Sequence, residues 1–195
     1  VQHGQDGRPA GRVALEDLLD LLAHRFVEEL GHTSGPSRAG VGLSPQRGLV
    51  PLQCPLLQDV QIAQQQHAHE DDHFEAGGEI HTIEISGVRV TPLICYDLRF
   101  PELFRVAALD TDLFVVLANW PSRRAHAWRT LLAARAIDSQ AWLLGVNRIG
   151  KAEGHPHRGD TSLLDPWGEV VATLAEEPGV ITGEVDATVV RETRR

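Results

Sequence analysis

The sequence predicts a layered α/β fold, in which helices pack against a sheet. Two observations predict it. Apolar runs of strand length at residues 88–95, 113–118 and 142–147 alternate with segments of helical periodicity at 101–110 and 126–140, and this alternation is typical of α/β cores. The length of 195 residues, with 42% hydrophobic side chains, is sufficient for one domain with its own core.

The first 69 residues differ in character from the rest. Residues 13–30 place leucines at helical spacing with acidic residues between them, and Gly31 follows as a stop, so we expect one amphipathic helix near 13–30. From there to residue 69 the sequence is rich in glycine, proline, serine and glutamine without a sustained period, which predicts irregular structure. We therefore expect a divergent segment over 1–69 and a folded domain over 70–195.

The remaining elements follow in order along the second segment. The alternating stretch IHTIEIS and Gly87 predict a hairpin that leads into the buried strand at 88–95. Pro101 marks the start of the first helix. Beyond Gly150 we expect a polar loop over 151–160. After this loop we expect an antiparallel meander of three segments, 161–165, 170–175 and 180–186. The turn PWGE joins the first two of them.

Charge and cysteine content exclude several classes of protein. The formal net charge of −9 provides no basic surface for nucleic acid or an anionic membrane. No apolar run approaches the roughly 20 residues of a membrane span, and the N-terminus does not resemble a signal peptide. Two cysteines, Cys54 and Cys95, are too few for a disulfide-stapled secreted domain. We expect a cytoplasmic protein with reduced thiols.

Cys95 is the principal candidate for chemistry. It ends a buried strand and is followed by Tyr96, Asp97 and then a helix, a strand-turn-helix order that exposes a side chain at the edge of a sheet. The alternative is that Cys95 is a small hydrophobic residue of the core, where cysteine packs well. The local pattern alone leaves both interpretations open.

A resemblance over residues 70–186 favours the first interpretation. The segments LICYDLRFPELFR, ANWP, ARAIDSQ, GVNR and DPWGEVV occur in this order, and together they resemble the nitrilase superfamily of carbon-nitrogen hydrolases, in its omega-amidase-like branch. The resemblance implies a four-layer α-β-β-α sandwich, of which this chain would carry the C-terminal portion, the N-terminal portion being replaced or missing.

The resemblance also implies roles for individual residues. Cys95 would attack the carbonyl of a small amide, such as the mono-amide of a dicarboxylic acid, to give a thioester and ammonia without a cofactor. The backbone N–H of Tyr96 would be one oxyanion donor. Glu70 would position the catalytic lysine and the substrate. A homodimer is the expected assembly.

Two groups of that family site have no counterpart in the sequence. Lys151 is the only lysine, and the stretch before Glu70 reads QIAQQQHAH. The base glutamate also has no match, because the acidic residues of 13–30 are assigned to the solvated face of the expected helix. The alternative is therefore a catalytically incomplete nitrilase-like protein or fragment.

Polar residues after the strands are candidates for substrate binding. Asn119, Trp120 and Arg123 follow the apolar run at 113–118, and Arg99 follows Cys95. An arginine here could bind a substrate carboxylate through two hydrogen bonds. The alternatives are core packing for the tryptophans, including Trp128, and structural ion pairing for the arginines, including Arg135.

A histidine-rich stretch carries the remaining candidate ligands. His67, His69, Glu70 and His73 could be read as a zinc site, but their spacing is not that of the helical zinc motif. We therefore expect a solvated loop and no metal.

Overall fold

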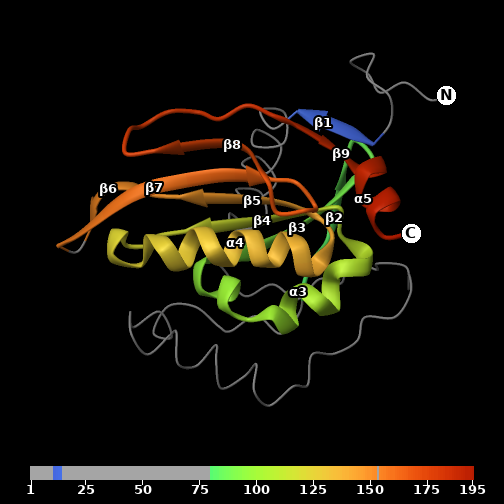
Figure 1. Ribbon diagram of the computed structural model, residues 1–195, viewed down its shortest axis with the longest axis horizontal. Coiled ribbons are helices and arrows are strands. Elements are labelled where there is room, and N and C mark those ends of the chain that lie inside the picture. Colours follow the sequence, from blue (N-terminus) through green and yellow to red (C-terminus); the bar gives the residue numbers. More distant parts are fainter. Residues whose placement is uncertain (1–10, 15–79, 153) are drawn as a thin grey trace, which may run out of the picture. The chain divides into compact units, whose positions relative to one another are not determined.

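The computed structural model describes residues 11–14, 80–152 and 154–195. The strands of its main sheet are β2 (Ile83–Ile85), β3 (Val88–Ile94), β4 (Leu113–Ala118), β5 (Trp142–Asn147), β6 (Ile149–Ala152), β7 (His155–Leu164) and β8 (Val170–Ala175). The α-helices are α3 (Pro101–Ala107), α4 (Ala125–Ser139) and α5 (Ala187–Thr193). Helices α3 and α4 lie along one side of the sheet (Figure 1). None of the described helices is long and apolar enough to cross a membrane.

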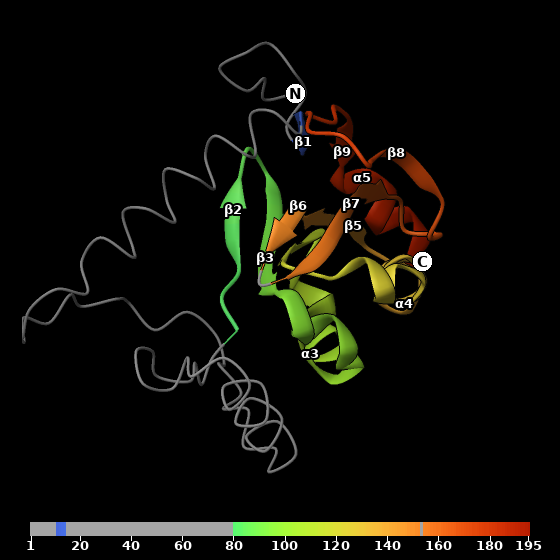
Figure 2. The same ribbon diagram turned by 90° about the vertical axis from the view of Figure 1, so that its left-hand side faces the viewer.

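The centre of the sheet is parallel. Its order is β2-β3-β4-β5-β7-β6 with β8 beside β7, and β2 forms one edge (Figure 2). Strands β3, β4 and β5 run in the same direction, with Val90 opposite Leu113 and Leu113 opposite Trp142. The predicted strands 113–118 and 142–147 are confirmed. Because the carboxyl ends of parallel strands meet at one edge, the segments that follow β3 and β4 lie at the same edge.

The helical layer packs closely on the sheet at a glycine. A Cβ atom on Gly145 of β5 would lie 2.7 Å from the methyl carbons of Leu132 and 2.8 Å from the indole of Trp128. Both of these side chains belong to α4 and are almost fully buried. The absence of a side chain at Gly145 therefore allows α4 to approach β5, while Phe104 of α3 packs on Phe114 of β4 at 4.9 Å between ring centroids.

The opposite face of the sheet is covered at its amino end by the C-terminal part of the chain. Strand β1 (Arg12–Ala14) pairs antiparallel with β9 (Glu184–Asp186), which leads into α5. Val185 and Val190 belong to one buried cluster with Val90, Leu113 and Leu144 of the parallel strands. The C-terminal part of the chain therefore packs at the amino ends of the parallel strands, whereas the segments that follow β3 and β4 lie at their carboxyl ends.

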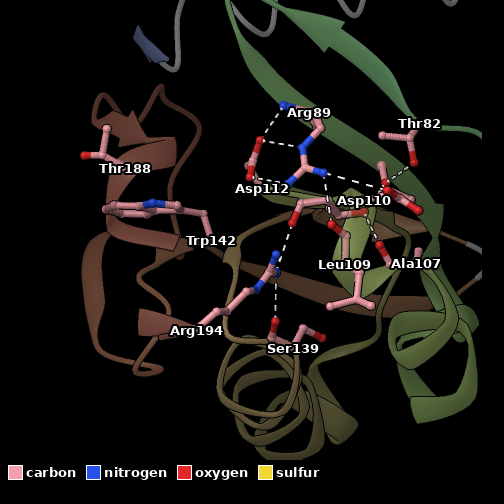
Figure 3. Close-up of polar contacts among 12 residues, drawn as sticks. Thr82, Arg89, Ala107, Leu109, Asp110, Asp112, Ser139, Trp142, Thr188 and Arg194 are labelled. Carbon is pink, nitrogen blue, oxygen red and sulfur yellow. Dashed lines mark hydrogen bonds and ion pairs between the residues drawn. The ribbon is translucent and has the colours of Figure 1, made fainter. Parts of the chain in front are cut away.

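An ion pair and several hydrogen bonds hold the amino ends of the central strands together, as Figure 3 shows. Arg89 of β3 donates from Nη2 and Nε to the two carboxylate oxygens of Asp112, at 2.9 and 3.0 Å. Burial favours the protonated carboxyl, but the hydrogen bonds from Arg89 outweigh it and lower the pKa of Asp112. Arg194 donates to the carbonyls of Thr111 and Ser139 at 3.0 and 2.9 Å, which attaches the C-terminus to the same edge.

Three expectations about elements need correction. A polar loop was expected over 151–160, but residues 151–152 belong to β6 and residues 155–160 to β7, which pair as an antiparallel hairpin, and 161–164 continue β7. Its polar side chains are compatible with a strand because β6 is an edge strand, whose outer side needs no apolar cover. Strand β8 pairs with β7 as the meander predicts, but of 180–186 only the last three residues are a strand, and they pair with β1. Val13 and Ala14 belong to β1, and the rest of the helix expected near 13–30 lies outside the described residues.

Candidate active site

Cys95 sits at a sharp change of backbone direction. Strand β3 ends at Ile94, and Cys95 begins a five-residue 3-10 helix, η2 (Cys95–Arg99). The φ angle of Cys95 is +46°, in the left-handed region that costs a residue with a side chain about 1–3 kcal/mol and is concentrated at functional sites. The expected strand 88–95 is therefore one residue shorter, and the half-buried side chain of Cys95 stands where the strand turns.

The side chain of Asp97 closes this turn. Its Oδ2 atom accepts a hydrogen bond from the backbone N–H of Ile94 at 2.8 Å, so the contact spans Cys95. Burial raises the pKa of the Asp97 carboxyl, although the N–H of Ile94 acts in the opposite direction. The backbone N–H of Phe100 donates to the carbonyl of Asp97 at 2.9 Å, which closes the other end of η2.

Arg135 holds the same segment from α4. Its Nε donates to the carbonyl of Leu98 at 3.1 Å and its Nη2 to that of Arg99 at 3.4 Å. The side chain also pairs with Asp138 at 3.4 Å, and burial lowers the pKa of its guanidinium. Since it binds backbone carbonyls and one neighbour on the helix, Arg135 has the structural role that the sequence left open.

Arg99 connects the segment after β3 with the segment after β4. Its guanidinium carbon lies 5.1 Å from the centre of the Tyr96 ring and 5.0 Å from the Trp120 ring, distances typical of cation-π contacts. The Nε atom of Arg99 is buried and has no hydrogen-bond partner within the described part of the chain. Arg99 is thus held by aromatic faces and not by an ion pair with a described carboxylate.

Asn147, the last residue of β5, fixes the segment after β4. Its Oδ1 accepts from the backbone N–H of Trp120 at 2.8 Å, and its Nδ2 donates to the carbonyls of Trp120 at 3.2 Å and Gly159 at 2.7 Å. The indole of Trp120 is buried, donates to the carbonyl of Arg124 at 2.9 Å and packs on Trp128 at 5.5 Å. The packing of Trp120 on Trp128 therefore anchors the segment after β4 to helix α4.

The predicted site residues that the structure describes gather at one edge of the sheet. Cys95, Tyr96 and Arg99 follow β3, whereas Trp120 and the exposed Asn119 and Arg123 follow β4. Glu70, Cys54 and the histidine-rich stretch lie outside the described residues. Among the residues that are described, no group of three histidine, cysteine or acidic side chains could hold a metal ion.

Sequence reasoning assigned no role to Asp97 or Asn147, and left Arg135 undecided. A usable signal existed for the first two, because Asn147 is a polar residue at the end of a buried strand and Asp97 is one that follows shortly after a buried strand. Such residues must find hydrogen-bond partners, and backbone groups at the ends of strands are available.

The arrangement agrees with the comparisons to known proteins. The carbon-nitrogen hydrolase family model matches residues 44–195, so the chain belongs to the carbon-nitrogen hydrolase family. The omega-amidase YafV of Escherichia coli K12 is 42% identical over 129 residues, which are 65% of this chain and 50% of that protein. The 2-oxoglutaramate amidase of Bacillus subtilis is 36% identical over 119 residues, or 60% and 46%. The chain spans about half the length of the curated relatives it matches.

Solved structures confirm the nitrilase-type fold. The CN-hydrolase superfamily protein XC1258 from Xanthomonas campestris is 35% identical, with a TM-score of 0.60 over 66% of this chain and 52% of that one. A variant of the amidase from Nesterenkonia sp. is 26% identical, with a TM-score of 0.56 over 65% and 49%. Its structure shows covalent addition of the acetamide moiety of fluoroacetamide at the active-site cysteine.

Proposed function

We propose that this chain carries the nucleophile of an amidase-type carbon-nitrogen hydrolase, and that Cys95 is that nucleophile. The thiolate of Cys95 attacks the carbonyl carbon of a small amide and forms a tetrahedral intermediate. When the C–N bond breaks, the nitrogen takes up the proton that the Cys95 thiol lost when it became a thiolate and leaves as ammonia, and an acyl thioester remains. Water then hydrolyses the thioester to a carboxylic acid and restores the thiol.

The observation that carries the proposal is the turn at Cys95. A residue with a side chain adopts φ +46° at the carboxyl edge of parallel strands. The segment around it is fixed by the hydrogen bond that Asp97 accepts from the N–H of Ile94 and by the one that Arg135 donates to the carbonyl of Leu98. Loops at such an edge commonly form the binding site of an open α/β sheet. The acetamide adduct on the cysteine of the Nesterenkonia amidase supports the same chemistry. The N–H of Tyr96 is the proposed oxyanion donor.

The proposed substrate is the mono-amide of a dicarboxylic acid. Arg99 is a cation at the same edge, and its guanidinium makes no hydrogen bond to another described residue, so it is available to a substrate carboxylate. Arg123 is exposed and lies in the segment after β4. Arg123, Asn119 and Trp120 are the other proposed contacts of the substrate. The names of two relatives, an omega-amidase and a 2-oxoglutaramate amidase, support this substrate class.

We also propose that Glu70 is the acidic partner of the site. A divergent segment over 1–69 before a domain over 70–195 remains a prediction. We also propose a cytoplasmic location and a homodimer. Size-exclusion chromatography with light scattering would measure the mass.

Ammonia release from a matched pair of amides tests the function. Succinamate and butyramide have chains of the same length, but only the first carries a carboxylate. We expect the chain to release ammonia from succinamate faster than from butyramide, Cys95→Ala to release none, and Arg99→Gln to lose the preference for succinamate. Folded protein that releases no ammonia from either amide would instead favour a catalytically incomplete member, for which the single lysine, Lys151, is the supporting feature.

A further inference from the structure

The contact between Asp97 and Ile94 encloses the nucleophile. The carboxylate accepts the N–H of the residue before Cys95 at 2.8 Å and belongs to the residue two positions after it. Within this short loop Cys95 has φ +46°, a conformation that a cysteine does not keep unless its surroundings impose it. The hydrogen bond of Asp97 is the side-chain contact that joins the two ends of the loop.

Ion pairing does not explain Asp97. Within the described residues its carboxylate pairs with no arginine, lysine or histidine, and burial disfavours its charge. A charged group that is partly desolvated without a cation reduces stability unless its hydrogen bond compensates. The interaction that accounts for Asp97 is therefore the hydrogen bond that it accepts within the turn, from the N–H of Ile94.

The rest of η2 is held independently. Arg135 of α4 binds the carbonyls of Leu98 and Arg99, which fixes the segment after the turn, and the pairing of β3 with β4 up to Ile94 fixes the segment before it. The direction of the Cα–Cβ bond of Cys95 is set by the few backbone bonds between these two fixed parts. The contact of Asp97 with Ile94 constrains those bonds.

We propose that Asp97 is a positioning residue, whose hydrogen bond to Ile94 aims the sulfur of Cys95 at the carbonyl of a bound amide. The proposal depends on the proposed function only for the identity of the nucleophile. It requires an acceptor oxygen at position 97 and not a negative charge. Asp97→Asn should therefore preserve the alignment, because the amide oxygen can accept the same N–H, whereas Asp97→Ala should lose it.

Two thiol reagents separate alignment from exposure. Chloroacetamide carries the amide group of the substrates, whereas N-ethylmaleimide reports the general accessibility of the thiol. Rates at Cys95 are measured by mass spectrometry of its peptide, which distinguishes it from Cys54. We expect the ratio of the chloroacetamide rate to the maleimide rate to fall about tenfold in Asp97→Ala, the upper end of the effect of losing one hydrogen bond that does not depend on a charge. The ratio in Asp97→Asn should stay within about twofold of the parent chain.

Asp112→Asn is the matched control, since it weakens a carboxylate contact at the opposite edge of the sheet. It should lower stability and leave the ratio unchanged. An unchanged ratio in Asp97→Ala, or an equal fall in Asp97→Asn or in Asp112→Asn, would overturn the proposal. Neither reagent requires turnover, so a chain that releases no ammonia but shows the predicted ratios would disprove the proposed activity and still support the role of Asp97.

Discussion

Asn147→Ala provides a quantitative test of how the loop after β4 is held. The substitution removes three hydrogen bonds, to the N–H and carbonyl of Trp120 and to the carbonyl of Gly159. Asn147 is only 9% exposed, so water cannot fully replace these partners. At about 0.5–1.5 kcal/mol for each bond, we expect the free energy of unfolding to fall by about 2–4 kcal/mol, which corresponds to a decrease in Tm of about 4–16 °C for a domain of this size.

Urea denaturation followed by circular dichroism, with the slope of the transition held in common, measures this change. Asn119→Ala is the matched control, because Asn119 is the same residue type in the same loop but is exposed and makes no side-chain hydrogen bond to another described residue. It should change the free energy of unfolding by less than about 0.5 kcal/mol. Equal effects of the two substitutions would refute the reasoning that Asn147 fixes the loop.

The remaining predictions concern packing and pH. Gly145→Ala should lower the free energy of unfolding by about 1–3 kcal/mol, because the added Cβ would lie under 3 Å from Leu132 and Trp128. Calorimetry would measure this change, and an unchanged Tm would contradict the close contact. The lowered pKa of Asp112 means that its carboxylate stabilises the fold above about pH 4, the value of an unfolded aspartate, and that this contribution is lost as the pH falls through the lower folded value. Asp112→Asn should therefore lower the free energy of unfolding at pH 7 by about 2 kcal/mol. The difference in this free energy between the variant and the parent chain should shrink as the pH falls. A constant difference from pH 7 to pH 2 would argue against the contact with Arg89.

Strands buried on both faces were the most predictable part of the fold. Leu113–Ala118 and Trp142–Asn147 have the predicted bounds, because a parallel strand between two layers is apolar almost throughout. The hairpin of β6 and β7 was missed, since the polar residues of an exposed edge give no period. The pairing of β1 with β9 joins residues far apart in the sequence, and no local pattern identifies such a contact.

The position of Cys95, the proposed nucleophile, was predictable, but its backbone conformation was not. The motif around Cys95 indicated a residue at the end of a strand, and the structure places it one residue beyond β3, at the start of η2. Positive φ is usually inferred from glycine or asparagine, so a cysteine at +46° gives no signal of its own. The contacts of Asp97 and Asn147 were not predicted either, although both residues lie near strand ends, because their partners are backbone groups, and Asn147 and Trp120 lie 27 residues apart in the sequence.

The central claim is that Cys95 forms an acyl thioester with the carbon skeleton of an amide substrate. Rapid acid quench during exposure to succinamate, followed by mass spectrometry of the Cys95 peptide, tests it most directly. We predict an added succinyl group on Cys95 that disappears once the substrate is exhausted and is absent from Cys95→Ala. Release of ammonia without any acyl group on Cys95 at any quench time, or equal release by Cys95→Ala, would contradict the account.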